Sequence, residues 1–488
     1  MVEQELWNLI QKIQKQGCEA QTIEVKSAHI GCPEKLYDTI SSFSNQNSGG
    51  VFVFGLDERE NFREVGVYDA QDLQKKVMEY CEQMTPAVRP VFTVCGEGDL
   101  VFVSAEIPPV DLAERPCYKT AKGRGNGSYI RVGDADKPMT EYEVYSYEAF
   151  RKKYRDDIRP VERGTLESLD SVRVNEYLAR KRNERPHLSA IPEEQQYEFA
   201  GITRDGQITL ASLLLFGIYP QGYYPGLCII ASRVPGNEIG NTDPSGLRFT
   251  DRKRIEGTIP EMIDGALSFV RNNMRVSTKI DAKTGERTDV PQYPMDAVRE
   301  AILNALVHRD YSFHTEGMPV QLTMYDNRLE MINPGGLYGR LTIDQLGNMQ
   351  PDTRNPVLVS SMETLGKTEN RYSGIPTIRF AMKKLSLPDP VFADSRGSFQ
   401  VILYNSFDKE SSAEQIHSES AADIKDEKGL IEFCRTPRTR AEIIGYLDIP
   451  SGQYALKRYL EPLVKSGAIR MTLPDKPRSI KQKYITAE

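Results

Sequence analysis

The sequence predicts a multidomain α+β protein, and three observations indicate this fold class. The chain has 488 residues, which is too long for one ordinary domain and suggests about three. Between residues 20 and 135, strand-like and helix-like patterns alternate. A Ser-rich acidic segment, 406–426, then separates a short basic C-terminal region from the rest of the chain.

The net charge, the cysteine pattern and the length of the apolar segments limit the class of protein. The formal net charge of −7 argues against a uniformly basic nucleic-acid-binding surface, although a local basic face is still possible. The seven cysteines are scattered without a CxxC pair, which indicates reduced thiols in a cytoplasmic protein. Segment 1–17 is amphipathic and lacks the apolar core of a signal peptide, and the longest apolar run, 210–219, is too short to span a bilayer. We therefore expect a cytoplasmic protein without a membrane partner.

Residues 1–145 are predicted to form one α+β domain, followed by a charged helical connector over 146–199. Hydrophobic alternation predicts the strands, and longer amphipathic stretches predict the helices. The expected strands are 22–26, 49–57, a hairpin over 91–108 and a closing strand over 127–133, and the expected helices are 34–46 and 69–84.

A second region, 200–405, contains the most informative helix, "REAILNALVHRDY" at 299–311. Its apolar residues cover most of the helix circumference, which is typical of a buried helix. Glu300, Asn304 and His308 are nevertheless spaced four residues apart and share one face. Buried polar groups need partners, so this face either meets solvent or lines a polar cavity. The other elements expected here are a helix at 261–274, a hairpin over 319–337, helices near 355–366 and 374–385, and a strand at 397–404.

The order of these elements, with "LLLFG", "HRDY", "NPGGL", "RYSGIPTIRFAMKKL" and "GSFQVIL", resembles a known nucleotide-binding fold. It is the GHKL-type α/β sandwich of gyrase-type ATPases, Hsp90 chaperones, histidine kinases and mismatch-repair ATPases. The likeness is greatest to the divergent branch found in bacterial ATP-binding transcriptional regulators. The resemblance implies that ATP and Mg²⁺ are cofactors.

The resemblance also implies roles for individual residues. Glu300 corresponds to the general base that activates water, and Asn304 to the amide ligand of Mg²⁺, one helical turn away. His308 matches no catalytic position of the family and is expected to be structural.

Two glycine-containing motifs complete the implied nucleotide site. Asn333 stands where the family places the Asp that recognises the adenine amino group, and an amide discriminates adenine less well because it also donates hydrogen bonds. Gly335 and Gly336 would let the backbone approach the ligand. Ser373 and Gly374 begin a helix whose free N–H groups can meet phosphate, although an ordinary helix cap explains them equally well.

The motifs "GCEAQTIEVK", "SSFSNQNSGGVFVFGLDE" and "SYIRVG" resemble the AlbA-like domain of prokaryotic Schlafen-type proteins, over about 15–145. Members of that family bind nucleic acid, and some are RNA nucleases that use three carboxylates. Glu19, Glu24 and Asp57 occupy the matching positions. Lys26 and Arg131 would contact phosphate. Acidic residues at strand ends and ordinary surface charge are the alternative explanations.

Residues 427–488 resemble a winged helix with a recognition helix near 451–467. This region has 12 Lys and Arg against 7 Asp and Glu, a net charge of +5 in a chain of net −7. Nucleic-acid contacts are expected from the helix start and from the basic wing, although winged helices also serve as protein-interaction modules. The residues concerned are Ser451, Gln453, Tyr454, Lys457 and Arg458 in the helix, and Arg478, Lys481 and Lys483 in the wing.

These features together indicate a nucleic-acid-binding transcriptional regulator in which ATP–Mg²⁺ is a conformational switch. DNA is the favoured partner, RNA is an alternative, and a homo-oligomer is expected. The segment 337–373, between the glycine motifs, is expected to act as a lid. The alternative hypothesis is a nucleotide-gated, metal-dependent nuclease of Schlafen type with a role in phage defence.

Overall fold

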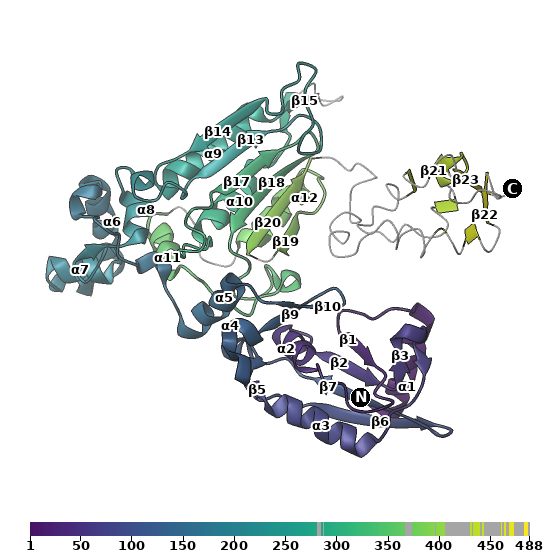
Figure 1. Ribbon diagram of the computed structural model, residues 1–488. Coiled ribbons are helices and arrows are strands. Elements are labelled where there is room, and N and C mark those ends of the chain that lie inside the picture. Colours follow the sequence, from purple (N-terminus) through teal and green to yellow (C-terminus); the bar gives the residue numbers. More distant parts are fainter. Residues whose placement is uncertain are drawn as a thin grey trace. The chain divides into compact units, whose positions relative to one another are not determined.

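The structure is a computed structural model that divides the chain into two compact units, 1–409 and 410–488 (Figure 1). It describes residues 1–280, 285, 287–366, 373–395 and 397–405 of the first unit. In the second unit it describes residues 430–431, 433–439, 442–443, 460, 463–464, 468–472 and 483–486. The predicted mixed α/β architecture is confirmed.

The N-terminal region is built on a four-stranded sheet whose strand order is β1-β2-β7-β6. Phe52 and Phe54 of β2 pack with α2 and α3, while Val53 between them packs with α1 on the opposite face. The sheet is therefore covered on both sides, which explains the continuous apolar run of β2. The elements are β1 (Ile23–Lys26), β2 (Gly50–Phe54), β6 (Val91–Glu97), β7 (Leu100–Ile107), α1 (Glu3–Gln16), α2 (Tyr37–Asn45) and α3 (Ala70–Glu82).

The expected closing strand of this sheet pairs elsewhere. β9 (Tyr129–Val132) forms a separate two-stranded ribbon with β10 (Ala135–Pro138). The buried Asn45 side chain of α2 accepts from the Cys117 N–H and donates to the carbonyls of Cys117 and Tyr129. The ribbon is thus attached to α2 by the hydrogen bonds of Asn45, and it is separate from the four-stranded sheet. The smaller elements are β3 (Leu56–Asp57), β4 (Arg63–Glu64), β5 (Met84–Thr85), β8 (Tyr118–Lys119) and α4 (Gly123–Gly127).

The charged connector is helical, as predicted. Thr140 and Glu143 form a reciprocal capping box at the start of its first helix, and Asp170 caps the second. The connector leads into a short buried helix formed by the "LASLLLF" run. The elements are α5 (Glu141–Lys152), α6 (Ser171–Glu184), α7 (Glu193–Phe199), β11 (Thr203–Arg204), β12 (Gln207–Ile208) and α8 (Leu210–Phe216).

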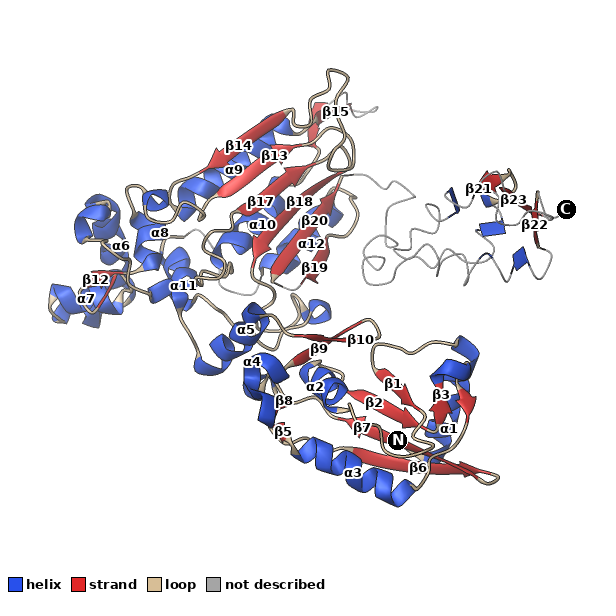
Figure 2. Ribbon diagram, in the orientation of Figure 1, coloured by secondary structure: helices blue, strands red, loops and turns tan. Residues whose placement is uncertain are grey.

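The central region is a two-layer sandwich of a six-stranded sheet and helices (Figure 2). The strand order is β14-β13-β17-β18-β20-β19, with only the β13–β17 pair parallel. Helices α9, α10 and α12 lie over one face, with α10 between the other two. The elements are β13 (Ile229–Arg233), β14 (Asp251–Ile255), β17 (Val320–Met324), β18 (Arg328–Pro334), β19 (Val391–Ser395), β20 (Ser398–Tyr404), α9 (Ile259–Asn273), α10 (Met295–Val307), α11 (Pro356–Thr364) and α12 (Gly374–Lys384). A two-stranded ribbon, β15 (Val276–Ile280) with β16 (Arg287–Pro291), connects α9 to α10.

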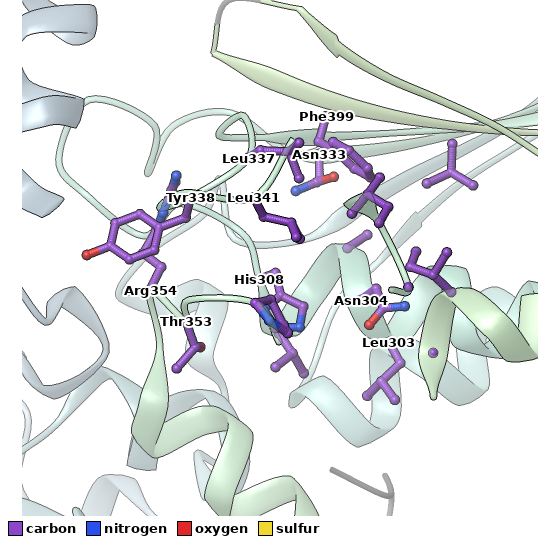
Figure 3. Close-up of a pocket in the computed structure, with 18 of the residues that line it drawn as sticks. Leu303, Asn304, His308, Asn333, Leu337, Tyr338, Leu341, Thr353, Arg354 and Phe399 are labelled. Carbon is purple, nitrogen blue, oxygen red and sulfur yellow. The ribbon is translucent and has the colours of Figure 1, made fainter. Parts of the chain in front are cut away.

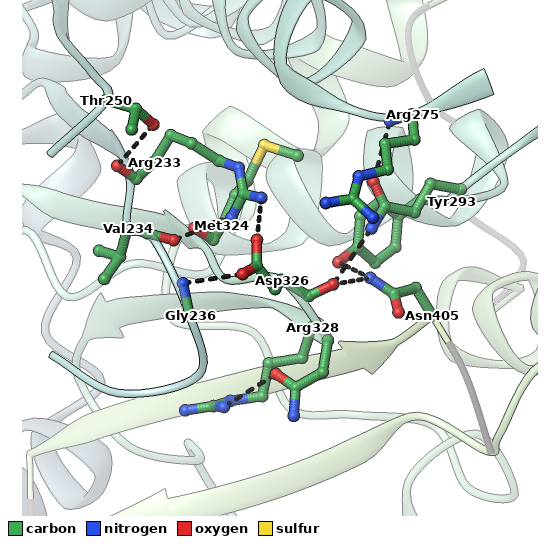
Figure 4. A network of polar contacts seen from close by, with 12 residues as sticks. Arg233, Val234, Gly236, Thr250, Arg275, Tyr293, Met324, Asp326, Arg328 and Asn405 are labelled. Atoms are coloured by element: carbon green, nitrogen blue, oxygen red, sulfur yellow. Dashed lines mark hydrogen bonds and ion pairs between the residues drawn. The ribbon is translucent and has the colours of Figure 1, made fainter. Parts of the chain in front are cut away.

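The turn between β17 and β18 is fixed by a polar network around Asp326 (Figure 4). The Asp326 carboxylate accepts from the Arg233 guanidinium at 2.5 Å and from the Gly236 N–H at 2.8 Å. Its backbone carbonyl accepts from the Asn405 side chain at 2.9 Å, and that side chain also donates to the Tyr293 hydroxyl at 3.0 Å. This network ties the hairpin to the loop after β13 and to the residue that follows β20.

In the second unit the described strands form a three-stranded sheet in the order β21-β23-β22. The strands are β21 (Arg438–Thr439), β22 (Ile469–Met471) and β23 (Lys483–Thr486). Within the part of the chain that the structure describes, no helix is long and apolar enough to cross a membrane.

Candidate functional site

Helix α10 has the buried apolar surface that its sequence predicts. It also carries the predicted row of polar residues, Glu300 and Asn304 with His308 directly after the helix, which we call the polar line. Eight of its residues are buried against the sheet and the neighbouring helices. Glu300 and Asn304 are only partly buried. Both line a cavity of about 270 Å³ between α10, the end of β18 and the start of α12. The polar line therefore faces a cavity that can hold a ligand.

All seven residues assigned to nucleotide binding or hydrolysis line this one cavity. In Figure 3, Asn304 and His308 lie on one side and Asn333, Leu337 and Phe399 on the other. The apolar side chains offer a surface for a flat ring, while the amides supply hydrogen-bonding groups. The seven are Glu300, Asn304, Asn333, Gly335, Gly336, Ser373 and Gly374.

The first turn of α12 lies against the polar line of α10 at Gly374. A Cβ atom on Gly374 would be 2.4 Å from Glu300 Oε1 and 3.0 Å from Asn304 Nδ2. A larger residue would displace the ends of these two side chains, so glycine leaves Glu300 and Asn304 in place beside the start of α12. Ser373 precedes it at the start of the helix, where backbone N–H groups have no intrahelical acceptor.

The surroundings of the Glu300 carboxyl shift its pKa. Burial raises its pKa, while the positive charge of Arg299 and a hydrogen bond from Asn304 oppose the rise. A carboxylate whose pKa moves toward neutrality is a better proton acceptor at physiological pH. Because the amide nitrogen of Asn304 donates to Glu300, the amide oxygen of Asn304 is left for another partner.

Gly335 and Gly336 allow close packing beneath the cavity. Gly335 has φ +96°, and a Cβ there would be 2.4 Å from Arg354 Nη1. A Cβ on Gly336 would be 2.4 Å from Asp394 Oδ1. Both glycines are therefore needed for a backbone path that brings Asn333 to the cavity wall.

His308, for which only a structural role was expected, lines the cavity at the C-terminal end of α10. Burial together with the positive charge of Arg354 lowers the pKa of His308 to about 4. His308 is therefore neutral at physiological pH. Its four-residue spacing from Asn304 already indicated this position.

Sequence reasoning did not find Arg354 as a residue of the cavity. Arg354 Nη1 is 3.0 Å from Asp310 Oδ2, and that carboxylate also accepts from the Tyr142 hydroxyl at 2.6 Å. Asp310 belongs to the "HRDY" motif and Tyr142 to α5. The motif thus connects the cavity to the connector helix. No local pattern identifies Arg354, because it lies on an irregular segment before α11.

The cavity contains polar groups that fit a polar ligand with a metal ion. The Thr353 hydroxyl lines the cavity and is buried without a hydrogen-bond partner among the described residues. A Mg²⁺ ion bound to a nucleotide needs one or two protein oxygens, since phosphate and water supply the rest. The amide oxygen of Asn304 and the glycine-rich walls meet these requirements.

The N-terminal region holds a separate ionic cluster around Arg131. Its guanidinium is 2.7 Å from Glu24, 3.6 Å from Glu19 and 3.1 Å from Asp136, and only 4% of Arg131 is exposed. The Nη1 and Nη2 atoms of Arg131 thus pair with carboxylates, which argues against the expected contact with phosphate. The partly exposed Lys26 also pairs with Glu24.

The three carboxylates assigned to a nuclease site do not gather into one group. Glu19 and Glu24 lie together, and burial and Glu24 raise the pKa of Glu19 to about 7. Asp57 instead caps a short helical turn by accepting from the Arg59 N–H at 3.0 Å. In the described parts of the chain, no three His, Cys, Asp or Glu side chains form a group that could hold a metal ion.

Most residues assigned to nucleic-acid binding in the C-terminal region lie outside the described residues. Lys483 is described and lies in β23. Those outside are Ser451, Gln453, Tyr454, Lys457, Arg458, Arg478 and Lys481.

Comparison with protein families identifies the domain types. Residues 19–140 match the family described as "Schlafen, AlbA_2", and residues 317–403 match "Putative ATP-dependent DNA helicase recG C-terminal". The chain thus has an AlbA_2 domain and an ATPase-type domain. Residues 428–486 match "Filamentation induced by cAMP protein Fic-like, C-terminal domain". These matches do not show the expected winged helix.

Two solved structures are also similar to the chain. The DIP2311 protein from Corynebacterium diphtheriae is 19% identical, with 99% of this chain and 97% of that chain covered and a TM-score of 0.39. The N-terminal domain of a "Putative ATP-dependent DNA Helicase RecG-related Protein" from Nitrosomonas europaea is 24% identical, with 28% and 93% covered and a TM-score of 0.23. Both TM-scores are too low to establish a shared overall fold. A comparison with curated proteins finds no match.

Proposed function

We propose that the protein is a nucleic-acid-binding transcriptional regulator that responds to ATP and Mg²⁺. The observation that carries the proposal is the convergence of Glu300, Asn304, Asn333 and Gly374 on one cavity. The ATPase-type family match over residues 317–403 supports nucleotide use, and the AlbA_2 match supports a nucleic-acid-related role.

Each group of the cavity has a chemical role in this proposal. Asn304 would supply an amide oxygen to Mg²⁺, which neutralises phosphate charge when bound. Glu300 would accept a proton from water, and its raised pKa suits that task. Asn333 would face the base through its carbonyl oxygen, and Gly374 would bring the start of α12 toward phosphate.

The segment 337–373, expected to act as a lid, contributes residues to the cavity lining. Leu337, Leu341, Gly347 and Arg354 line the cavity, and residues 367–372 lie outside the described residues. In the proposed switch, the described part of this segment closes on the nucleotide.

The first experiment compares ATP binding and hydrolysis in the wild type and in Glu300→Gln. We expect ATP affinity within a few-fold of wild type and turnover reduced about 100-fold or more, because the amide cannot accept the proton. Asn304→Ala should weaken Mg²⁺-dependent ATP binding. Asp296→Asn, an exposed carboxylate on the same helix, is the control and should change neither quantity. If neither Glu300→Gln nor Asn304→Ala alters binding or turnover, the site assignment is wrong.

A second candidate function, a metal-dependent nuclease, is favoured by one observation. Glu19 and Glu24 lie side by side, and the raised pKa of Glu19 is typical of functional carboxylates. Incubation of the protein with tRNA and single-stranded DNA, with Mg²⁺ or Mn²⁺, tests this function. Cleavage that is lost in Glu24→Gln and kept in Glu58→Gln would support the nuclease. The absence of cleavage under all conditions would favour the regulator.

A further inference from the structure

A second pocket, of about 320 Å³, lies apart from the nucleotide cavity. It is lined by residues of α6, of the α7–β11 segment and of α11, with Arg155 from the connector. The two pockets have no lining residue in common.

The second pocket is strongly basic. Its lining contains Arg155, Lys181, Arg185 and Arg204 but a single carboxylate, Glu198. That carboxylate already accepts hydrogen bonds from the Thr203 hydroxyl and the Gly206 N–H. Four positive charges around one concave surface create a potential that attracts anions.

The cations of the pocket are poorly paired. Within the described parts of the chain, Arg155 and Arg185 make no ion pair, and Arg204 only approaches Asp205 at 4.0 Å. Three arginines with free guanidinium donors can bind phosphate oxygens in a bidentate manner.

Lys181 is the most informative residue of this pocket. It is only 6% exposed, and its nearest carboxylate, on Glu184, is 4.0 Å away, which is too far for a hydrogen bond. The other contact of its ammonium group is with the face of the Tyr177 ring, 5.5 Å from the ring centroid, and such a contact is weak. An anion in the pocket would supply a closer partner of opposite charge.

We propose that this pocket binds a small, multiply charged phosphorylated molecule. Lys181 and the arginines hold the phosphate groups. Phe199, which is 70% exposed at the pocket, gives an apolar surface for the rest of the ligand. The cavity volume equals that of about ten water molecules, which is room for pyrophosphate or a compound of similar size.

Helix α11 connects this pocket to the nucleotide cavity. Val357 and Ser360 line the anion pocket, whereas Val359 lines the nucleotide cavity. The buried Asp157 accepts from the Val357 N–H at 2.7 Å, and Asn355 Nδ2 donates to the carbonyl of Val307 at the end of α10 at 2.9 Å. A ligand that shifts α11 will therefore change the nucleotide cavity. This regulatory part rests on the proposed nucleotide function, whereas the anion site does not.

The test of the site is a calorimetric titration of the full chain with inorganic pyrophosphate. We expect binding to the wild type that is weakened about tenfold or more in Lys181→Met and in Arg185→Gln, because each loses a charge-assisted contact. Lys253→Gln removes an exposed charge on β14 and should bind normally. Arg185 is exposed, so its variant tests the site even if Lys181→Met fails to fold.

Several outcomes would overturn the anion site. These are no binding to the wild type at millimolar pyrophosphate, equal binding in all variants, and loss of binding in Asn304→Ala, which would place pyrophosphate in the nucleotide cavity. Competition by a short oligonucleotide but not by any mononucleotide would overturn the small-molecule assignment in favour of nucleic acid.

The regulatory part is tested by ATP affinity with and without saturating pyrophosphate. We expect a change of at least about fivefold in the wild type, and Arg185→Gln should need about tenfold more pyrophosphate to reach the same change. Unchanged ATP affinity with pyrophosphate bound would refute the coupling between the two pockets. It would leave the proposed anion site supported. If the wild type binds pyrophosphate but no ATP, the proposed function fails and the anion site is kept.

Discussion

Gly374 is the residue at which the first turn of α12 meets the polar line of α10. Gly374→Ala places a methyl group 2.4 Å from Glu300 Oε1, so the Glu300 carboxylate or the start of α12 must shift. We expect ATP affinity to fall about tenfold or more, with a loss of stability of about 1–3 kcal/mol from overpacking. Equilibrium titration and urea unfolding measure these effects. Gly125→Ala is the matched control, since a Cβ there meets nothing within 4 Å. Equal affinities in the two variants would contradict the predicted geometry.

In the proposed function, Asn333 faces the base and sets how well the cavity distinguishes adenine from other bases. Asn333→Asp restores a group that only accepts hydrogen bonds, so a base with an amino group at this position should be favoured. We expect the ratio of ATP to GTP affinity to rise about tenfold, the value of one hydrogen bond. Competitive binding measures the ratio, and Asn175→Asp on the exposed face of α6 is the control. An unchanged ratio would show that Asn333 does not face the base.

Asp157 gives a prediction about pH. It is fully buried, and burial raises its pKa from 3.8 to about 6 although the N–H groups of Val357 and Leu358 donate to it. Between pH 4 and 6 the folded state therefore holds a proton that the unfolded state has lost. Its contribution to stability is present below about pH 4 and is lost as pH rises through 6, by up to about 3 kcal/mol. Asp157→Asn should flatten this part of the stability profile measured by urea unfolding. A profile with the wild-type slope would contradict the assignment.

At the scale of elements, α5 contacts residues of the cavity through the Tyr142 hydroxyl and through the Phe150 ring, which packs on Tyr338. Tyr142→Phe removes the hydroxyl donor to Asp310 and leaves that buried carboxylate with Arg354 and the Ser312 N–H as partners. We expect a loss of about 1–2 kcal/mol in the free energy of unfolding. ATP affinity should change as well, because Arg354 lines the cavity. Tyr118→Phe is the control, and similar effects in both variants would argue against the link.

The long elements were predictable because their hydrophobic patterns are clear. Helix α10 and the hairpin of β17 and β18 lie where the sequence places them. Strands β13 and β14 were not predicted. Four of the five residues of β14, Asp251–Ile255, are exposed on the sheet edge, so no apolar alternation marks it. The apolar run of β13 is short, and such runs do not distinguish strand from helix.

At the scale of the whole molecule, the sequence predicted that the residues assigned to the nucleotide site would converge. It did not predict which positive charge would neutralise the N-terminal carboxylates. The nucleotide residues converge because helix spacing and motif order fix their positions on α10, β18 and α12. The N-terminal carboxylates differ, since Arg131 reaches Glu24 from a ribbon more than 100 residues away. A pairing between segments so distant in sequence has no local pattern. For this reason the metal-binding triad was expected and the ionic cluster was not.

The two units of the chain predict a separation of functions. The described residues that line the cavity all lie within residues 1–409, whereas residues 427–488 have a net charge of +5. A chain truncated after Lys409 should keep its melting temperature and ATP affinity but bind nucleic acid more weakly, because salt-dependent phosphate contacts are lost. Fluorescence anisotropy over a range of salt concentrations measures this. The full-length variant Lys457→Gln/Arg458→Gln/Lys481→Gln separates charge from deletion. Its plot of log affinity against log salt should be less steep by up to about 3. If truncation leaves both affinity and slope unchanged, the AlbA_2 domain alone carries nucleic-acid binding.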